Sequence, residues 1–195
     1  MTFPNTAVLY LRAYKETPGK MKYVIATPGG TVQYDVPVMK VQSYSMEDIF
    51  EKGLLMLLPF YIFSHEKGFP EYNSNVQKLE ELKAEYQKIL ERLDGLEQQE
   101  AIGAFEKRTI IELSGDVIKE IAQKYENVQK GIGDMMSGAL IETSARAILN
   151  QGISQNQRET ALRLLKRGKQ TIEEIAEDTG LSAAEVERLA GLQTV

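Results

Sequence analysis

The sequence contains no cysteine and no tryptophan, and its only histidine is His65. The missing thiols exclude disulfide bonds, thiolate catalysis and cysteine-based zinc sites. A single histidine cannot form the histidine clusters that bind metal ions in many enzymes. Because Glu66 and Lys67 follow His65 directly, we expect a surface turn there rather than a catalytic base. A chain without cysteine is compatible with the reducing cytoplasm, so we expect a cytoplasmic protein.

Long apolar runs are also missing from the sequence. The run Leu54–Phe63 has ten residues and is interrupted by Pro59. It is about half as long as the roughly 20 residues that cross a bilayer as a helix. The N-terminus lacks the basic start and the apolar stretch of a signal peptide. We therefore expect this run to be buried core, and we expect no association with a membrane.

The chain has no excess of positive charge. It contains 23 basic and 28 acidic residues, which gives a net charge of −5 and a pI near 5.1. Such a chain is not attracted as a whole to nucleic acid or to anionic membranes, so binding of either kind needs a local basic patch. With 43% hydrophobic and 26% charged residues among 195, the composition is that of a folded protein of one or two domains.

The first 70 residues carry the strand signals. β-Branched and aromatic residues dominate four short runs in this region. Pro18-Gly19 and Pro28-Gly29-Gly30 separate the first three runs and predict short antiparallel connections. Ser45 is expected to cap a helix that continues to Pro59. The predicted strands are residues 7–14, 21–26, 31–36 and 38–42.

The strand signals stop near residue 70, and the pattern beyond is helical. This part of the chain contains two apolar stripes separated by a turn-prone region at 95–103, and the second stripe extends from Ile110 to Met135. Two matching stripes in sequence can bury each other, so we favour a helical hairpin within one chain. An intermolecular coiled coil stays the alternative. The first stripe has the 3-4 spacing of a heptad seam and comprises Leu79, Leu82, Tyr86, Ile89, Leu93 and Leu96.

The tail of the chain has the pattern of two short helices around a tight turn. Thr171 with Glu174 and Ser182 with Glu185 form two capping boxes, each of which satisfies the free amides at a helix start. Gly180 lies between the two predicted helices and provides the turn. The arrangement is typical of a helix-turn-helix.

These regions predict an α+β fold with three parts. Gly152 and the polar residues after it predict a joint before the tail. The expected parts are a small sheet with a packed helix in residues 1–70, a long helical hairpin in residues 71–150, and a basic helix with a helix-turn-helix-like tail in residues 151–195.

Charge is segregated within the last part. Ser154–Gln170 contains five bases and one acid, a net charge of +4, whereas Thr171–Gly191 contains six acids and one base, a net charge of −5. DNA affinity depends on cations that face phosphates, and the second short helix exposes mainly serine, alanine and glutamate. We therefore favour self-association over DNA reading. The candidate contacts to a partner or to nucleic acid are Arg163, Lys166, Arg167 and Lys169.

No common catalytic motif occurs in the sequence. We find no phosphate-cradling loop, dinucleotide fingerprint, nucleophile elbow or His-Glu-x-x-His. Glu81 and Lys83 have the spacing of a nuclease metal site, but they lie on the predicted seam helix and we expect a solvated helix face. Asp35, an isolated acid on a predicted strand, is expected to be structural or exposed. We therefore predict no catalytic, metal-binding or cofactor-binding residue.

Several segments together resemble a known family in residue types and in order. They are Phe3–Arg12, Tyr34–Val41, Ile49–Phe63, Lys130–Gly138, Leu164–Lys169 and Ile172–Ser182, of which Ile49–Phe63 is the most specific. They resemble the downstream portion of the recombination-promoting nuclease and putative transposase family, a branch of the PD-(D/E)XK superfamily. The resemblance covers nearly the whole chain.

The resemblance implies descent from a Mg²⁺-dependent DNA endonuclease. In that family the catalytic Asp and the Glu-x-Gln or Glu-x-Lys pair precede the strand that Phe3–Arg12 resembles, so no residue here corresponds to them. Magnesium is expected only if such an upstream core is present. We expect a non-catalytic C-terminal portion, either a fragment or a truncated gene product, that self-associates or binds a full-length family member. The alternatives are an endonuclease whose catalytic residues lie upstream, and a nucleic-acid-binding accessory protein.

Overall fold

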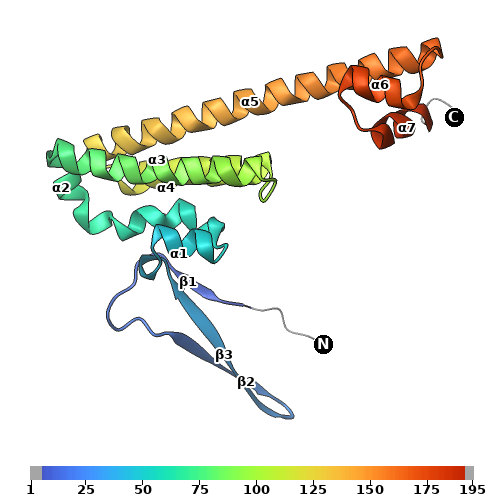
Figure 1. Ribbon diagram of the computed structural model, residues 1–195. Coiled ribbons are helices and arrows are strands. Elements are labelled where there is room, and N and C mark those ends of the chain that lie inside the picture. The colour runs from blue at the N-terminus through green and yellow to red at the C-terminus, as the bar shows by residue number, and fades with distance from the viewer. Residues whose placement is uncertain (1–5, 192–195) are drawn as a thin grey trace. The chain divides into compact units, whose positions relative to one another are not determined.

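The computed structural model describes residues 6–191 and has the expected α+β class. It contains a small three-stranded sheet followed by helices (Figure 1). The chain divides into two compact units, Met1–Ile141 and Glu142–Val195. Phe3, Pro4 and Asn5, the start of the first segment that resembles the nuclease family, lie outside the described residues.

The sheet consists of β1 (Val8–Tyr10), β2 (Lys20–Thr27) and β3 (Gly30–Lys40) in the order β1-β3-β2. β2 and β3 form the expected antiparallel hairpin around Pro28 and Gly29. Two expectations were wrong. β1 pairs with β3 in parallel, because the chain crosses to the far edge before the hairpin reverses its direction. The two runs predicted on either side of Pro37 form one strand.

The expected cap at Ser45 is confirmed. The Ser45 Oγ accepts a hydrogen bond of 3.1 Å from the backbone N–H of Asp48, and the Asp48 carboxylate accepts one from the backbone N–H of Ser45. The helix α1 (Met46–Glu51) ends early, however, instead of reaching Pro59. Gly53 follows with a φ of 65°, a left-handed conformation that stops the helix.

The apolar run after α1 forms the 3-10 helix η2 (Leu55–Ser64), which contains Pro59. Most of its apolar side chains are buried or half-buried in the main hydrophobic core, as predicted, whereas Met56 is 58% exposed. Two further 3-10 turns, η1 (Val41–Ser43) and η3 (Glu66–Gly68), flank this part of the chain. The core residues of η2 are Leu57, Leu58, Tyr61, Ile62 and Phe63.

Four helices follow: α2 (Phe69–Ser74), α3 (Val76–Gln98), α4 (Ala104–Ile121) and α5 (Glu126–Arg167). The four central residues of the predicted seam, Leu82, Tyr86, Ile89 and Leu93, are buried in the same core as the apolar residues of α4 and of the first turns of α5. Leu79 and Leu96 are half-buried. The intramolecular interpretation is therefore confirmed. The second predicted stripe is divided between α4 and α5, because the chain turns at residues 122–125.

The second unit contains the C-terminal part of α5 with α6 (Ile172–Thr179) and α7 (Ala183–Gly191). The joint expected after Gly152 is not a loop, since α5 is helical through residues 152–157. Within residues 6–191, no helix has both the length and the apolar character needed to cross a membrane.

Candidate functional site

The three helices of the second unit pack around a small apolar nucleus. Ala161 of α5, Ile175 of α6 and Val186 of α7 are fully buried together. Both capping boxes form as predicted: the Thr171 Oγ1 accepts from the N–H of Glu174 and the Ser182 Oγ accepts from the N–H of Glu185. The surrounding apolar residues are Leu164, Leu165, Ile172, Ala176, Leu181 and Leu189.

The turn between α6 and α7 depends on Gly180. Its φ is 70°, and it ends α6 by donating its backbone N–H to the carbonyl of Ala176. A Cβ atom at this position would lie 3.1 Å from the Nε2 of Gln157 on α5. Glycine is therefore favoured by the left-handed conformation, and a side chain here would also have to displace the end of Gln157 slightly.

The four predicted contact residues lie together at the end of α5, and all are exposed. Arg163, Lys166 and Arg167 share one helical face by their 3-4 spacing, and Lys169 follows the helix. The opposite face carries Ala161 and the other residues of the apolar nucleus. We call these four residues the basic cluster. Arg163 donates to the hydroxyl of Thr160, an uncharged partner.

The acids of α6 and α7 form a second exposed charged surface. Glu174 and Glu185 serve the capping boxes, and the pKa of Glu185 is lowered by its hydrogen bonds from the backbone N–H and hydroxyl of Ser182. The remaining acids lack a cationic partner: among residues 6–191, no ion pair within 4 Å joins the basic cluster to an acid. We call them the acidic surface, which comprises Glu173, Glu177, Asp178 and Glu187.

An exposed apolar patch precedes the basic cluster on α5 within the same unit. Ile148 is 71% exposed and Leu149 is 63% exposed, and Ile153 is exposed nearby. Side chains of this size on one short stretch of helix are typical of a surface that contacts another protein. We call these three residues the α5 apolar patch. We did not predict this patch from the sequence, although the 148-149-153 spacing could have indicated it.

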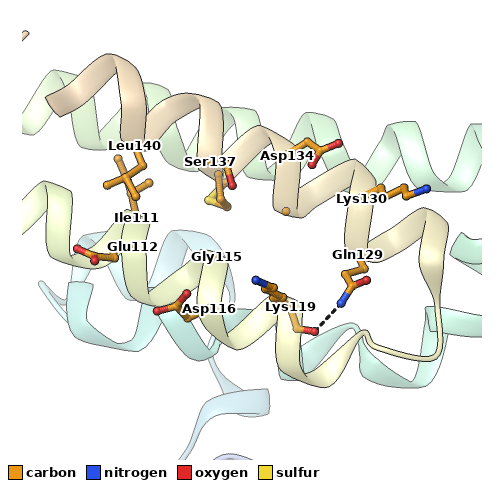
Figure 2. Close-up of a pocket in the computed structure, with 12 residues that line it drawn as sticks. Ile111, Glu112, Gly115, Asp116, Lys119, Gln129, Lys130, Asp134, Ser137 and Leu140 are labelled. Carbon is orange, nitrogen blue, oxygen red and sulfur yellow. Dashed lines mark hydrogen bonds between the residues drawn. The ribbon is translucent and has the colours of Figure 1, made fainter. Parts of the chain in front are cut away.

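A groove of about 400 Å³ lies between α4 and α5 in the first unit (Figure 2). A Cβ atom at Gly115 would lie 3.4 Å from the Cβ of Met136, so the two helices approach closely there. Gln129 Nε2 donates a hydrogen bond of 2.9 Å to the Lys119 carbonyl across the groove. The charges that line it are of both signs, which favours no single class of ligand. They are Glu112, Asp116, Asp134, Lys119 and Lys130.

The expectation that His65 lies in an open surface turn was wrong. Its ring is mostly covered, with the Nε2 3.6 Å from the carboxylate of Glu85 and the Nδ1 3.3 Å from the hydroxyl of Tyr72. Tyr61 donates a hydrogen bond to the same carboxylate. No local pattern indicated this cluster, because its members are up to 24 residues apart on η2, α2 and α3.

The Glu85 carboxylate should make stability depend on pH. The facing His65 ring is the main cause that lowers its pKa; burial opposes this, and the Tyr61 hydroxyl lowers it further. A lowered pKa adds stability above the unfolded value near 4.5, and this stability is lost as the pH falls through the folded pKa. We expect Glu85→Gln to cost about 1 kcal/mol at pH 7 and less at pH 3.

Urea unfolding between pH 3 and pH 7 would measure this difference. Glu51→Gln, at an exposed acid of α1, is the matched control and should leave the curve unchanged. A loss that stays constant over the whole range would contradict the electrostatic role of Glu85.

The other acids considered from the sequence are not brought together. Asp35 is exposed on β3 and faces Lys22 across the hairpin. Glu81 pairs with Lys78 on α3, and Lys83 pairs with Glu80, so both lie on a solvated helix face as expected. Among the described residues, no three acids or histidines are grouped in a way that could hold a metal ion.

No protein-family model, curated protein or solved structure matches this chain.

Proposed function

We propose that this chain is a non-catalytic association module that binds another copy of itself or a longer protein containing the same region. The observation that carries the proposal is that the basic cluster and the acidic surface lie in one compact unit without pairing with each other. Both remain available to a second chain, and opposite charges on one unit are complementary to the same charges on another. The resemblance to the nuclease family is the reason for the second kind of partner, a longer protein that carries the catalytic core.

The α5 apolar patch supports the same proposal on energetic grounds. Exposed ion pairs contribute only about 0–1 kcal/mol each, so charges alone give a weak complex. Burial of the exposed isoleucine and leucine side chains would contribute about 1.5–3 kcal/mol for each one fully covered. The patch would supply affinity, and the charges would select the partner and speed encounter.

Charge reversal tests the proposal. We expect Lys166→Glu with Arg167→Glu to raise the dissociation constant of self-association about tenfold or more, because it places acids opposite acids. Glu173→Lys with Glu177→Lys should do the same. An equimolar mixture of the two double variants should associate again, since each then supplies the charge that the other needs. Sedimentation velocity over a range of concentrations would measure all three.

The control changes net charge equally in the other unit. Lys15→Glu with Lys124→Glu replaces two exposed cations of the first unit and should leave association unchanged. Equal weakening by this control, or a mixture that fails to associate, would refute the proposal. If the partner is a longer protein, the same charge reversals would be tested between this chain and that protein. Opposite reversals on the two proteins, once mixed, must again restore binding.

DNA binding is the second candidate function, favoured by the four exposed cations at the end of α5. If it holds, the affinity for a duplex should fall steeply with salt, and the Lys166→Glu/Arg167→Glu variant should reduce the log–log slope by about 2. The acidic surface repels phosphate, so we place this function second. Fluorescence anisotropy with a labelled duplex at several salt concentrations separates the two functions.

A further inference from the structure

The β2–β3 hairpin has one polar and one apolar face. Side chains alternate along each strand, and the register pairs each apolar residue of β2 on this face with an apolar residue of β3. On the other face, Lys22 lies opposite Asp35 and Val24 opposite Gln33. The apolar face consists of three successive cross-strand pairs: Met21 with Val36, Tyr23 with Tyr34, and Ile25 with Val32.

This apolar face is open to solvent over most of its length. Tyr23, Ile25, Val32 and Tyr34 are between 39% and 50% exposed. The rings of Tyr23 and Tyr34 stack on each other with centroids 5.5 Å apart, which forms a flat apolar surface. Such continuous apolar surface on a small protein is typical of a contact with another chain.

The outer edge of β2 is also unpaired in the part of the chain that the structure describes. β2 is the last strand of the sheet, and it pairs with β3 over eight consecutive residues, Lys20 to Thr27, without a bulge. Natural proteins protect such edges with proline, bulges or charges in the strand. β2 contains no proline, and its only charges, Lys20 and Lys22, lie at its start. Among residues 6–191, no strand pairs with its outer edge.

We infer that β2 pairs antiparallel with β2 of a second copy, which joins the two sheets into one. β2 is compatible with a copy of itself in this direction only, because of where its two charges lie. In a parallel pair, Lys20 and Lys22 would lie beside the same lysines of the partner, which is destabilising. In an antiparallel pair, the lysines lie at opposite ends, against the uncharged end of the other strand.

Alternation limits the antiparallel pairing to two central registers. Either Tyr23 lies opposite the partner's Tyr23, or Val24 lies opposite the partner's Val24. Both keep the apolar faces on the same side of the joined sheet. In the first register, the stacked rings of Tyr34 and Tyr23 continue directly onto the partner's Tyr23 and the partner's Tyr34. The covered edge also satisfies backbone groups that otherwise depend on water.

This surface belongs to the first unit and does not depend on the association proposed for the second unit. Two different two-fold contacts on one chain would link more than two copies. If both hold, the full-length protein should form species larger than dimers, and loss of either contact should leave dimers. The two proposals can therefore fail separately.

The test is Val24→Lys in the full chain, with Val24→Thr as the control. Val24 is 58% exposed on the polar face, and threonine keeps the β-branched shape. In the first register, the introduced lysine meets Lys22 of the other copy, and in the second it meets the lysine introduced into the other copy. Both contacts place like charges opposite each other, which is destabilising.

We expect association to weaken at least tenfold for Val24→Lys and to stay unchanged for Val24→Thr. Both variants should keep the melting temperature of the natural chain, because the substituted side chain is exposed. The association of the Val24 variants is measured again in the Lys166→Glu/Arg167→Glu background, where Val24→Lys should still weaken it.

Disulfide trapping gives an independent measurement, because the chain has no cysteine of its own. Under mild oxidation, Tyr23→Cys or Val24→Cys should form cross-linked dimers, since one of these residues faces itself across the two-fold axis. Lys20→Cys should not. Cross-linking of Lys20→Cys would show a parallel pair and overturn the proposal. Unchanged association of Val24→Lys, or a free edge that pairs only with another protein, would overturn it as well.

Discussion

Replacement of Phe69 by alanine should cost about 3–5 kcal/mol of unfolding free energy, a large part of the stability of a domain of this size. Phe69 begins α2, is fully buried, and packs edge-on against Tyr125 with ring centroids 5.4 Å apart. It joins the same core as η2, α3 and α4, so the cavity would lie where several elements meet. Urea unfolding of the purified variant would measure the loss.

Phe105→Ala is the matched control for this prediction. Phe105 is the same residue type in the first turn of α4 but is 80% exposed, so its removal should change stability by less than about 0.5 kcal/mol. If Phe69→Ala cost no more than Phe105→Ala, α2 would not be fixed to the core by this side chain.

Local patterns in the sequence were sufficient to predict the buried face of α3 and the starts of three helices. The 3-4 spacing of Leu82, Tyr86, Ile89 and Leu93 places these residues on one face of α3, and that face is buried. The three caps predicted at Ser45, Thr171 and Ser182 form, because each involves only residues three positions apart.

Features that depend on distant residues could not be predicted in the same way. The parallel pairing of β1 with β3 depends on which edge the chain reaches after residue 19, and no local pattern specifies that. The break between α4 and α5 interrupts an apolar stripe whose spacing alone continues through it. The helix through Gly152 has no strong breaker, since a single glycine costs only about 1 kcal/mol.

The candidate surfaces show the same limit. The basic cluster was predicted from composition, but that it forms no ion pair within residues 6–191 depends on how α6 and α7 pack against α5. The alternation of β2 and β3 was visible in the sequence. No element among the described residues covers their apolar face. Whether such a face is covered depends on the whole fold and not on a local pattern.

The second large loss of stability is expected on substitution of Lys107. It lies in the first turns of α4 and is only 2% exposed, yet it is charged. Its Nζ forms ion pairs with Asp94 and, at 2.6 Å, with Glu97, both at the end of α3. Burial lowers the pKa of Lys107, but its hydrogen bonds to the two acids together outweigh burial and leave the pKa raised. The buried ammonium therefore joins the two helices near their connecting turn.

Lys107→Ala should cost about 3 kcal/mol at pH 7, because it leaves a cavity and two acids without their cation. Lys107→Met should cost clearly less, since methionine fills most of the space and a buried ion pair gains little over a packed apolar side chain. Lys119→Ala, at an exposed lysine of the same helix, should be nearly neutral. Urea unfolding of the three variants at pH 7 would measure these costs.

The pH dependence separates the ion pairs from simple packing. A raised lysine pKa adds stability below the unfolded value near 10.4, and this stability is lost as the pH rises through the folded pKa. The difference between the natural chain and Lys107→Met should therefore shrink above about pH 10.4, whereas a loss due to packing alone would not change with pH. A Lys107→Met loss that does not change with pH would mean that the charge contributes nothing, whereas equal losses for alanine and methionine at pH 7 would mean that the volume of the Lys107 stem contributes nothing.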